Sequence, residues 1–314
     1  MNLGAVNSIN WARILAQTTY YFYSYFNLTN NPEYKDGSKI RFVVPTGNFG
    51  DVLAGYFAKR MGLPAEKLVV ATNENDILDR FWKTGHYEKK AVHGVEAQGG
   101  IAADGAKAHE DGVRETLSPA MDILVSSNFE RLLWFLAYEF AAVAGMDDEW
   151  NKKQAGQEVE IWLKDLKTKG GFGVHADILT SAKKDFDSER VSDGQTIQTI
   201  KDFYRAKSSE EVNGGYVLDP HSAIGVAAAL RSIKRVPGTY HISLATAHPA
   251  KFANAVDLAL RDENGFSFDT VLPKEFVGLE KKEKRVITVE KGASWEGVRS
   301  IVEAEVEKEL SARK

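Results

Sequence analysis

The chain has 314 residues, of which 43% are hydrophobic and 27% are charged, and its formal net charge is -4 at pH 7. These values predict a soluble globular protein that buries a large core as one large domain or two smaller ones, and they argue against nucleic acid as a partner. The absence of cysteine excludes disulfides, thiolate metal sites and a cysteine nucleophile. Because no apolar run approaches the roughly 20 residues of a membrane span, we expect a cytoplasmic protein with no membrane partner.

A long helix is predicted from the capping candidates at residues 7–10 to about Phe26. The aromatic residues at 20–26 are interpreted as packing groups, because one helical stripe joins Ile14, Thr18, Tyr21, Phe22 and Tyr25. Arg13 lies one turn into this helix. It could neutralise an anion held at the helix start, and a solvated side chain is the alternative.

Residues 39–62 give the main chemical signal. The β-branched run at 39–44 ends at Pro45 and predicts a buried strand, and residues 52–60 have helical spacing that stops at Gly62. Between them lies the turn Thr46-Gly47-Asn48-Phe49-Gly50-Asp51. This order predicts a strand, a glycine turn and a helix.

The turn at 46–51 is expected to direct main-chain N–H groups and the positive end of a helix dipole at one spot. Its two glycines would let a phosphate approach the main chain. Thr46 and Asn48 would add side-chain donors, and Asp51 would cap the helix. A tight turn with nothing bound is the alternative.

A second strand is predicted at 67–72 and a second helix from Asp76 to Lys83, which together indicate a parallel sheet covered on both faces. Ligands of such sheets bind at the carboxyl ends of the strands. Asn73, Glu74 and Asn75 follow the second strand and lie at such an end, although as loop residues they could simply be solvated.

Residues 86–114 are rich in glycine and alanine and are interpreted as a mobile surface loop. The two histidines in this segment lack the spacing of metal ligands, so no metal site is expected. Ser126-Ser127-Asn128 is expected to cap an apolar helix at 129–143. Residues 147–209 are interpreted as a peripheral helical excursion without a catalytic role.

Two further strand-turn-helix units are predicted, with strands at 215–218 and 240–245. The first strand leads into Asp219-Pro220-His221-Ser222, where Ser222 would cap the next helix, and the second ends at Thr246. Each unit places polar groups at the carboxyl end of a strand, where the glycine turn also opens. The tail is predicted as a strand at 285–289 and a helix at 294–310. These patterns predict an α/β domain at 1–273 and a strand-helix extension at 274–314.

Six motifs in chain order resemble threonine synthase, specifically its fungal form. They are residues 7–13 (NSINWAR), 45–51 (PTGNFGD), 71–76 (ATNEND), 126–131 (SSNFER), 218–221 (LDPH) and 245–252 (ATAHPAKF). The resemblance spans nearly the whole chain. It implies a fold-type II pyridoxal-phosphate enzyme of the tryptophan-synthase-β kind, which converts O-phosphohomoserine and water to threonine and phosphate.

The resemblance also implies roles for particular residues. Gly47, Asn48, Phe49, Gly50 and Asp51 would bind the phosphate of pyridoxal 5'-phosphate through main-chain donors. Thr246 would present its hydroxyl to the pyridine nitrogen, which a hydroxyl, unlike a carboxylate, does not keep protonated. Asn7, Ser8 and Arg13 are candidates for holding the substrate phosphate.

One departure from the family pattern concerns catalysis. The resemblance implies that the Schiff-base lysine, in a Phe-Lys-Asp setting, and the Ser-Gly-Asp-Thr-Gly loop lie upstream of Met1. The Lys-Asp pairs of this chain, at 164–165, 184–185 and 201–202, lack the surrounding motif. We therefore expect a C-terminal portion of the enzyme with no catalytic residue of its own, weak cofactor binding, and self-association through an uncovered face.

Two alternatives remain open at this point. A non-catalytic binding module or assembly partner would keep the anion pocket without the lysine, whereas a lysine-bearing reading frame upstream would favour the enzyme. A dinucleotide site with Glu74 as the ribose-binding acid is the third interpretation, although the turn is Gly-x-x-Gly and not Gly-x-Gly-x-x-Gly.

Overall fold

The computed structural model describes residues 7–89, the main chain of 107–108, and residues 112–141, 146–206, 215–284, 286–290 and 292–312. The chain forms two units, Met1–Val271 and Leu272–Lys314. The predicted domain boundary, between 273 and 274, lies close to this division. That the first unit binds pyridoxal phosphate stays a prediction.

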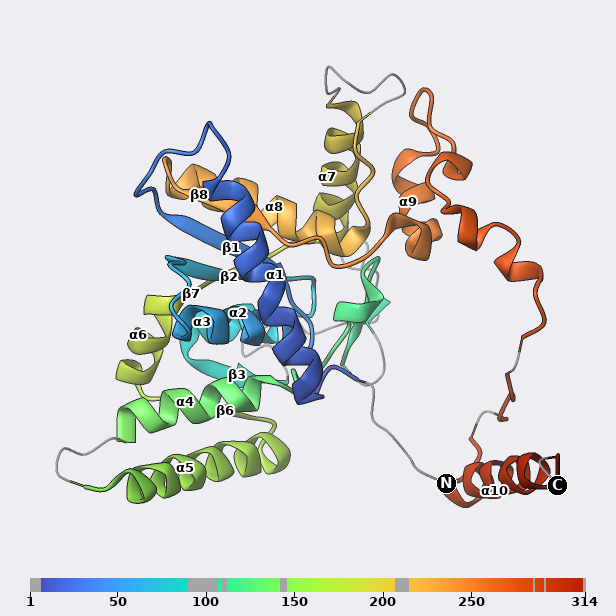
Figure 1. Ribbon diagram of the computed structural model, residues 1–314. Coiled ribbons are helices and arrows are strands. Elements are labelled where there is room, and N and C mark those ends of the chain that lie inside the picture. The colour runs from blue at the N-terminus through green and yellow to red at the C-terminus, as the bar shows by residue number, and fades with distance from the viewer. Residues whose placement is uncertain are drawn as a thin grey trace. The chain divides into compact units, whose positions relative to one another are not determined.

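A four-stranded parallel sheet lies at the centre of the first unit (Figure 1). Its strands, in the spatial order β7-β2-β1-β8, are Phe186–Arg190, Lys67–Thr72, Ile40–Pro45 and Tyr240–Ser243. All residues of β1 and nearly all of β2 are buried, as expected for strands that are covered on both faces. The parallel direction places the carboxyl ends of all four strands at one edge of the sheet.

Helices cover both faces of this sheet, with α8 on one side and α2 and α3 on the other (Figure 1). Side chains alternate accordingly, because successive residues of a strand point to opposite faces. Val43 and Val69 pack with α8, whereas Phe42 and Leu68 belong to the larger core on the opposite face. The helices of this unit are α1 Trp11–Thr29, α2 Gly50–Arg60, α3 Ile77–Thr84, α4 Phe129–Ala141, α5 Asp148–Thr168, α6 Ala176–Asp185, α7 Asp193–Arg205, α8 Pro220–Arg235 and α9 Ala253–Leu260.

Short elements complete the first unit. Two antiparallel pairs join β3 (His86–Glu88) to β6 (Gly171–Gly173) and β4 (Lys107–Ala108) to β5 (Arg114–Glu115). Short 3₁₀ helices are found at η1 (Pro119–Met121), η2 (Pro249–Phe252) and η3 (Phe268–Thr270). The first two of these 3₁₀ helices border the candidate site.

Two predictions about this unit were wrong, and a third lies mostly outside the described residues. Residues 147–209 are not a peripheral helical excursion, because β7 lies within them and pairs with β2 in the central sheet. The surface loop predicted at 86–114 falls mostly outside the described residues; of those described, 86–88 form β3, 107–108 form β4 and residue 114 begins β5. Residues 215–218 form no strand and lead into α8 without joining a sheet.

The second unit contains η4 (Lys274–Phe276), η5 (Leu279–Lys281) and α10 (Trp295–Ala312). The strand predicted at 285–289 was wrong over its described residues, because 286–289 form no strand. Val286 and Ile287 are 71% and 53% exposed, so the apolar side chains of this segment are not buried in a core. The helix predicted at 294–310 corresponds to α10.

Each of the described helices is too short or too polar to cross a lipid bilayer.

Candidate functional site

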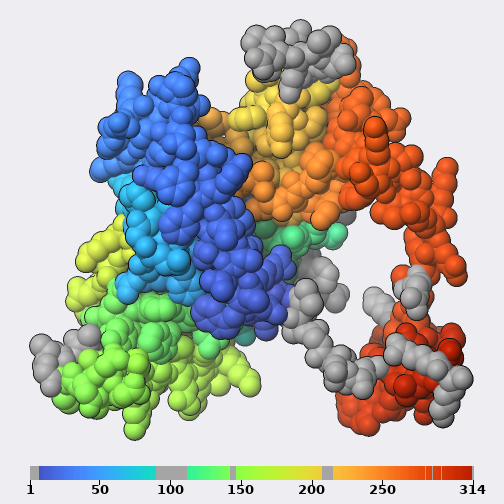
Figure 2. All heavy atoms as spheres, viewed as in Figure 1, coloured from blue at the N-terminus to red at the C-terminus, as the bar shows by residue number. Residues whose placement is uncertain are grey.

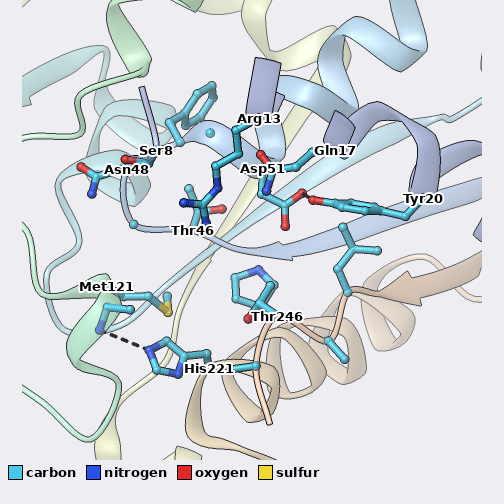
Figure 3. A pocket seen from close by; sticks show the side chains of 18 of the residues that line it. Ser8, Arg13, Gln17, Tyr20, Thr46, Asn48, Asp51, Met121, His221 and Thr246 are labelled. Carbon is cyan, nitrogen blue, oxygen red and sulfur yellow. Dashed lines mark hydrogen bonds between the residues drawn. The ribbon is translucent and has the colours of Figure 1, made fainter. Parts of the chain in front are cut away.

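A cavity of about 740 Å³ opens at the carboxyl ends of β1 and β8. Its walls come from α1, the turn at 45–51, η1, the first turn of α8, residues 244–247 and the end of η2. In Figure 3, Arg13 extends into this space from α1, while Met121, His221 and Thr246 lie across it from Arg13. Segments that are far apart in the sequence therefore meet at one edge of the sheet.

The structure brings most of the predicted site residues to this cavity. Ser8, Arg13, residues 47–51 and Thr246 all line it. Asn7 does not, and its side-chain oxygen instead accepts a hydrogen bond from the main-chain N–H of Ile9 at 3.2 Å. Of the three residues predicted to hold the substrate phosphate, two line the cavity, and their role stays a prediction.

The turn before α2 has an unusual backbone at Phe49. Its φ of +64° lies in the left-handed region, which non-glycine residues seldom adopt. The Phe49 side chain is buried and packs edge-on against Phe129, with the ring centroids 5.1 Å apart. Burial of this ring offsets the backbone strain, and such strain is often found at functional sites.

The main-chain N–H groups of residues 47–51 donate to no acceptor within the described part of the chain. They lie at the start of α2, where the helix dipole adds a partial positive charge. No side chain caps this helix end. An anion such as a phosphate would satisfy these donors.

The carbonyl groups of the same turn are held by the segment Ser126-Ser127-Asn128. The Ser126 hydroxyl donates to the Gly47 carbonyl at 2.8 Å. The Asn128 amide Nδ2 donates to the carbonyls of Asn48 and Ser8, at 2.8 and 2.9 Å. Asn128 thereby joins the two chain segments that were predicted to bind the two phosphates.

The glycines of the turn lie close to neighbouring backbone. A Cβ at Gly47 would lie 2.9 Å from the carbonyl oxygen of Ala120, and one at Gly50 would lie 3.3 Å from that of Ser8. The backbone leaves no room for a Cβ at Gly47, whereas at Gly50 a Cβ would fit only if its neighbours gave way slightly. Close chain packing therefore gives a reason for glycine in this turn besides the predicted approach of an anion, which stays a prediction.

Two side-chain predictions at the turn also need correction. The Thr46 hydroxyl donates to the Val44 carbonyl at 2.6 Å, so its proton is not available to an anion. Asp51 is not a helix cap, because its Oδ1 accepts hydrogen bonds from the hydroxyls of Tyr20 and Tyr21, at 2.6 and 2.9 Å. Tyr20 lines the cavity, so the aromatic segment of α1 does more than pack.

Burial raises the pKa of the Asp51 carboxyl above its ordinary value of 3.8, although the two tyrosine hydroxyls and Arg13 partly oppose that rise. The folded chain therefore binds this proton more tightly than the unfolded chain does. The contribution of Asp51 to stability is complete below pH 3.8 and is lost as the pH rises through the raised pKa.

Asp51→Asn should remove this pH dependence, because an amide oxygen can still accept both hydroxyl protons and carries no charge. As the pH rises above about 4, the unfolding free energy of the variant should increase relative to the parent by at most about 1.4 kcal/mol per pH unit. Urea unfolding at a series of pH values measures this difference. Asp257→Asn, at an exposed position on α9, is the control. If the unfolding free energy of Asp51→Asn fell relative to the parent as the pH rises, the raised pKa of Asp51 would be contradicted.

Thr246 lines the cavity at the end of the segment that follows β8. Its main-chain N–H donates to the Ser222 hydroxyl oxygen at 3.3 Å, while its own hydroxyl has no partner among the residues described. The prediction that Ser222 caps α8 was wrong, because the Asp219 side chain caps that helix. The hydroxyl of Thr246 is therefore available to a ligand.

Several lining residues were not predicted from the sequence, namely Gln17, Tyr20, Met121, His221 and Phe252. Gln17 and Tyr20 lie one and two turns beyond Arg13 on α1, so helical spacing could have indicated them. Met121 carries no such signal, because it arrives through long-range packing.

Asn73, Glu74 and Asn75 are not solvated. The Asn73 amide donates to Asp122, and the Glu74 carboxylate is fully buried and pairs with Arg114 at 3.0 Å. Glu74 pairs with Arg190 as well. Both arginines contact Oε2, and because the whole carboxylate is buried a ribose cannot reach it, which argues against the dinucleotide interpretation.

No lysine is among the described residues that line the cavity. The part of the chain that the structure describes also holds no group of three or more histidine, aspartate or glutamate side chains arranged to bind a metal ion. The cavity thus offers main-chain donors, hydroxyls, one arginine and one histidine.

Comparisons with known proteins point to one family. A family model described as "Threonine synthase, C-terminal" matches residues 222–302. The threonine synthase of Saccharomyces cerevisiae is 51% identical over 310 residues, which cover 98% of this chain and 54% of that protein. The chain spans about half the length of the curated relatives it matches.

Solved structures give the same result. The crystal structure of threonine synthase from yeast matches with a TM-score of 0.81 and 48% identity. The matched region covers 99% of this chain and 54% of the yeast chain. The crystal structure of pyridoxal-phosphate-bound threonine synthase from Brucella melitensis matches with a TM-score of 0.67 and 36% identity, and it covers 90% and 49% of the two chains.

Proposed function

This chain belongs to the threonine synthase family in sequence and fold, and we propose that it forms the part of such an enzyme that holds pyridoxal 5'-phosphate and the substrate phosphate. The α/β fold is then that of the fold-type II pyridoxal-phosphate enzymes. The reaction of the whole enzyme would be the conversion of O-phosphohomoserine and water to L-threonine and phosphate. The unpartnered N–H groups of residues 47–51, facing the Thr246 hydroxyl across one cavity, carry this proposal.

The residues present fit the cofactor's phosphate and ring. The N–H groups from Gly47 to Asp51 would bind the phosphate, and the dipole of α2 would stabilise its charge. Thr246 would hydrogen-bond the ring nitrogen without keeping it protonated. Bound pyridoxal phosphate would supply the electron sink that stabilises negative charge on the substrate's carbons.

Ser8 and Arg13 are proposed to hold the phosphate of O-phosphohomoserine. Arg13 lines the same cavity as the glycine turn, and its charge acts on the Asp51 carboxyl there. A guanidinium suits a phosphate because its fork of N–H donors matches two phosphate oxygens. Asn7 is the weaker member of the predicted group, since it does not reach the cavity.

Among the residues that the structure describes, those that line the cavity include no lysine to attach the cofactor covalently. Lys164, Lys184 and Lys201, the lysines of the Lys-Asp pairs, lie on α5, α6 and α7 and do not line it. Proton transfer at the substrate's carbons needs a positioned base, and a lysine performs this role in the family that the chain resembles. We therefore propose that this polypeptide alone lacks the group that makes the enzyme turn over.

Purified chain given pyridoxal phosphate and O-phosphohomoserine should release no phosphate above background. It should bind pyridoxal phosphate weakly and without the absorbance band that a lysine-bound cofactor gives. A coupled phosphate-release assay and an absorbance titration measure these two quantities. Turnover above background would overturn the proposed dependence on a lysine from outside this chain.

The same preparation separates the enzyme fragment from a non-catalytic binding module. We propose that the fragment self-associates in the cytoplasm through an apolar face of α1, the dark blue helix on the face shown in Figure 2. The Trp11, Leu15, Tyr23 and Phe26 side chains of α1 are each more than half exposed. Sedimentation velocity should then show association. A stable monomer that binds free pyridoxal phosphate tightly would favour the binding module.

A further inference from the structure

The Asp219 carboxylate lies next to the cavity and makes four hydrogen-bond contacts. It is 1% exposed and caps α8, where Oδ1 accepts from the main-chain N–H groups of His221 and Ser222 at 2.9 and 3.2 Å. Oδ1 also contacts Nδ1 of His221 at 3.2 Å, and Oδ2 pairs with the Ser222 hydroxyl. No lysine or arginine pairs with it in the described ranges.

Asp219 is ionised at neutral pH. Burial by itself would raise its pKa, but hydrogen bonds from His221 and Ser222 outweigh burial and hold the pKa below its ordinary value. An ionised carboxylate can only accept hydrogen bonds. The direction of the bonds on both neighbouring side chains is therefore fixed.

The first arm of this arrangement leads to Thr246. Because the Ser222 hydroxyl must donate its proton to Asp219, its oxygen is left to accept, and it accepts the main-chain N–H of Thr246 at 3.3 Å. The bond ties the segment after β8 to the start of α8. The backbone of Thr246, and with it the hydroxyl that faces the cavity, is held by Asp219 through Ser222.

The second arm leads to the opposite wall. Nε2 of His221 accepts the main-chain N–H of Ala120 at 3.3 Å (Figure 3), so the proton of a neutral His221 lies on Nδ1 and is donated to Asp219. The Ala120 carbonyl in turn lies against Gly47, close enough to exclude a Cβ there. Asp219 thus acts on the glycine turn through His221 and Ala120.

We propose that Asp219 is a positioning residue that sets the spacing between the two walls of the cavity, the ring wall at Thr246 and the phosphate wall at Ala120 and Gly47. The link to cofactor binding rests on the proposed function. The link between the walls does not, because every contact in it is internal to the chain.

Hydrogen exchange of individual amides, followed by NMR without cofactor, tests the two arms separately. Ser222→Ala should speed exchange of the Thr246 amide about tenfold and leave the Ala120 amide unchanged. His221→Phe keeps a ring against Phe252 and should do the reverse. Asp219→Asn, which is isosteric but uncharged, should speed exchange at both amides.

Two controls separate positioning from general loosening. Ser222→Thr retains the hydroxyl and should restore slow exchange at Thr246. Asp147→Asn makes the same substitution in a helix cap on α5, where the Asp147 side chain accepts from the main-chain N–H of Trp150. It should leave exchange of the Thr246 and Ala120 amides unchanged. The proposal is overturned if Ser222→Ala leaves Thr246 unchanged, or if each variant speeds both amides equally.

Titration with pyridoxal phosphate completes the experiment. Ser222→Ala and Asp219→Asn should weaken binding about threefold and about tenfold, since the second variant disturbs both walls. If exchange follows the expected pattern but the parent shows no saturable binding of pyridoxal phosphate at all, the proposed function fails and the positioning role stands. If the parent binds and exchange does not respond, the positioning role fails instead.

Discussion

Added pyridoxal phosphate should raise the thermal stability of the chain, and Gly47→Ala should abolish that gain. The new methyl group would lie 2.9 Å from the Ala120 carbonyl oxygen and 3.1 Å from the Met121 Cα. Both neighbours are backbone atoms, which cannot move aside as the end of a flexible side chain would. The turn at 46–51 must therefore shift, and its N–H groups lose their common direction.

The same substitution should lower the unfolding free energy by about 2–3 kcal/mol, as overpacking in a closed site does. Thermal melts with and without pyridoxal phosphate, together with urea unfolding, measure both effects. Gly156→Ala is a matched control, because Gly156 lies within α5 and a Cβ there meets nothing within 4 Å. That variant should gain about 0.5–1 kcal/mol and keep the response to cofactor.

A Gly47→Ala chain that still responds to pyridoxal phosphate would place the phosphate away from this turn. A loss of stability without loss of response would show that the close approach to Ala120 matters for folding alone. The two measurements together therefore locate the anion site.

Local patterns in the sequence predicted the elements that carry the site. The strand at 39–45 and the helix before Gly62 follow from a β-branched run, a glycine turn and helical spacing, each of which acts over a few residues. The helix from 76 to 83 matches α3, since Asp76 and Gly85 flank it as the caps. These signals are independent of tertiary context, so the sequence alone was sufficient.

Long-range contacts explain the predictions that were wrong. The strand β7 contains Asp187, Glu189 and Arg190, which give it no apolar run, and it forms because β2 supplies hydrogen bonds and Arg231 and Arg235 pair with its acids. Residues 286–289 show the opposite case. They have the alternation of a strand but no partner strand within the described residues.

The chemistry of the site was predictable in kind but not in detail. Main-chain donors at the glycine turn and a hydroxyl after β8 follow from motifs, whereas the partner of each side chain does not. Asp51 appears from sequence to be a helix cap, and only the packing of α1 against α2 shows that tyrosine hydroxyls occupy it. Asn128 likewise has the sequence signature of a cap, yet its side chain bonds to two distant carbonyls.

Asn128→Asp should be among the most damaging isosteric changes in the chain. Asn128 is fully buried, and its Nδ2 donates to the carbonyl oxygens of Ser8 and Asn48. An aspartate would replace this donor with an oxygen that repels both carbonyls. The buried charge, together with two carbonyl oxygens that lose their hydrogen-bond donor, should lower the unfolding free energy by about 3 kcal/mol.

Arg131 would offset only part of this cost. Its NH1 already donates to the Asn128 Oδ1 at 2.7 Å, and its NH2 holds the Ile9 carbonyl at 2.7 Å, with the guanidinium 4.4 Å above the Trp11 ring. A carboxylate at 128 would strengthen the first of these bonds. It would do nothing for Ser8, whose carbonyl would then face an anion.

The start of α1 should therefore detach from the glycine turn in Asn128→Asp, and hydrogen exchange over residues 8–13 should increase. Ser127→Ala is the matched control, because its exposed hydroxyl bonds only the Asn48 side chain, at 3.2 Å, and its loss should cost less than about 0.5 kcal/mol. If Asn128→Asp unfolds at the same urea concentration as the parent, Asn128 does not hold the two segments together. Ser8 and Arg13 would then have no fixed position relative to the glycine turn, and a cavity that binds two phosphates at a set distance would lose its structural basis.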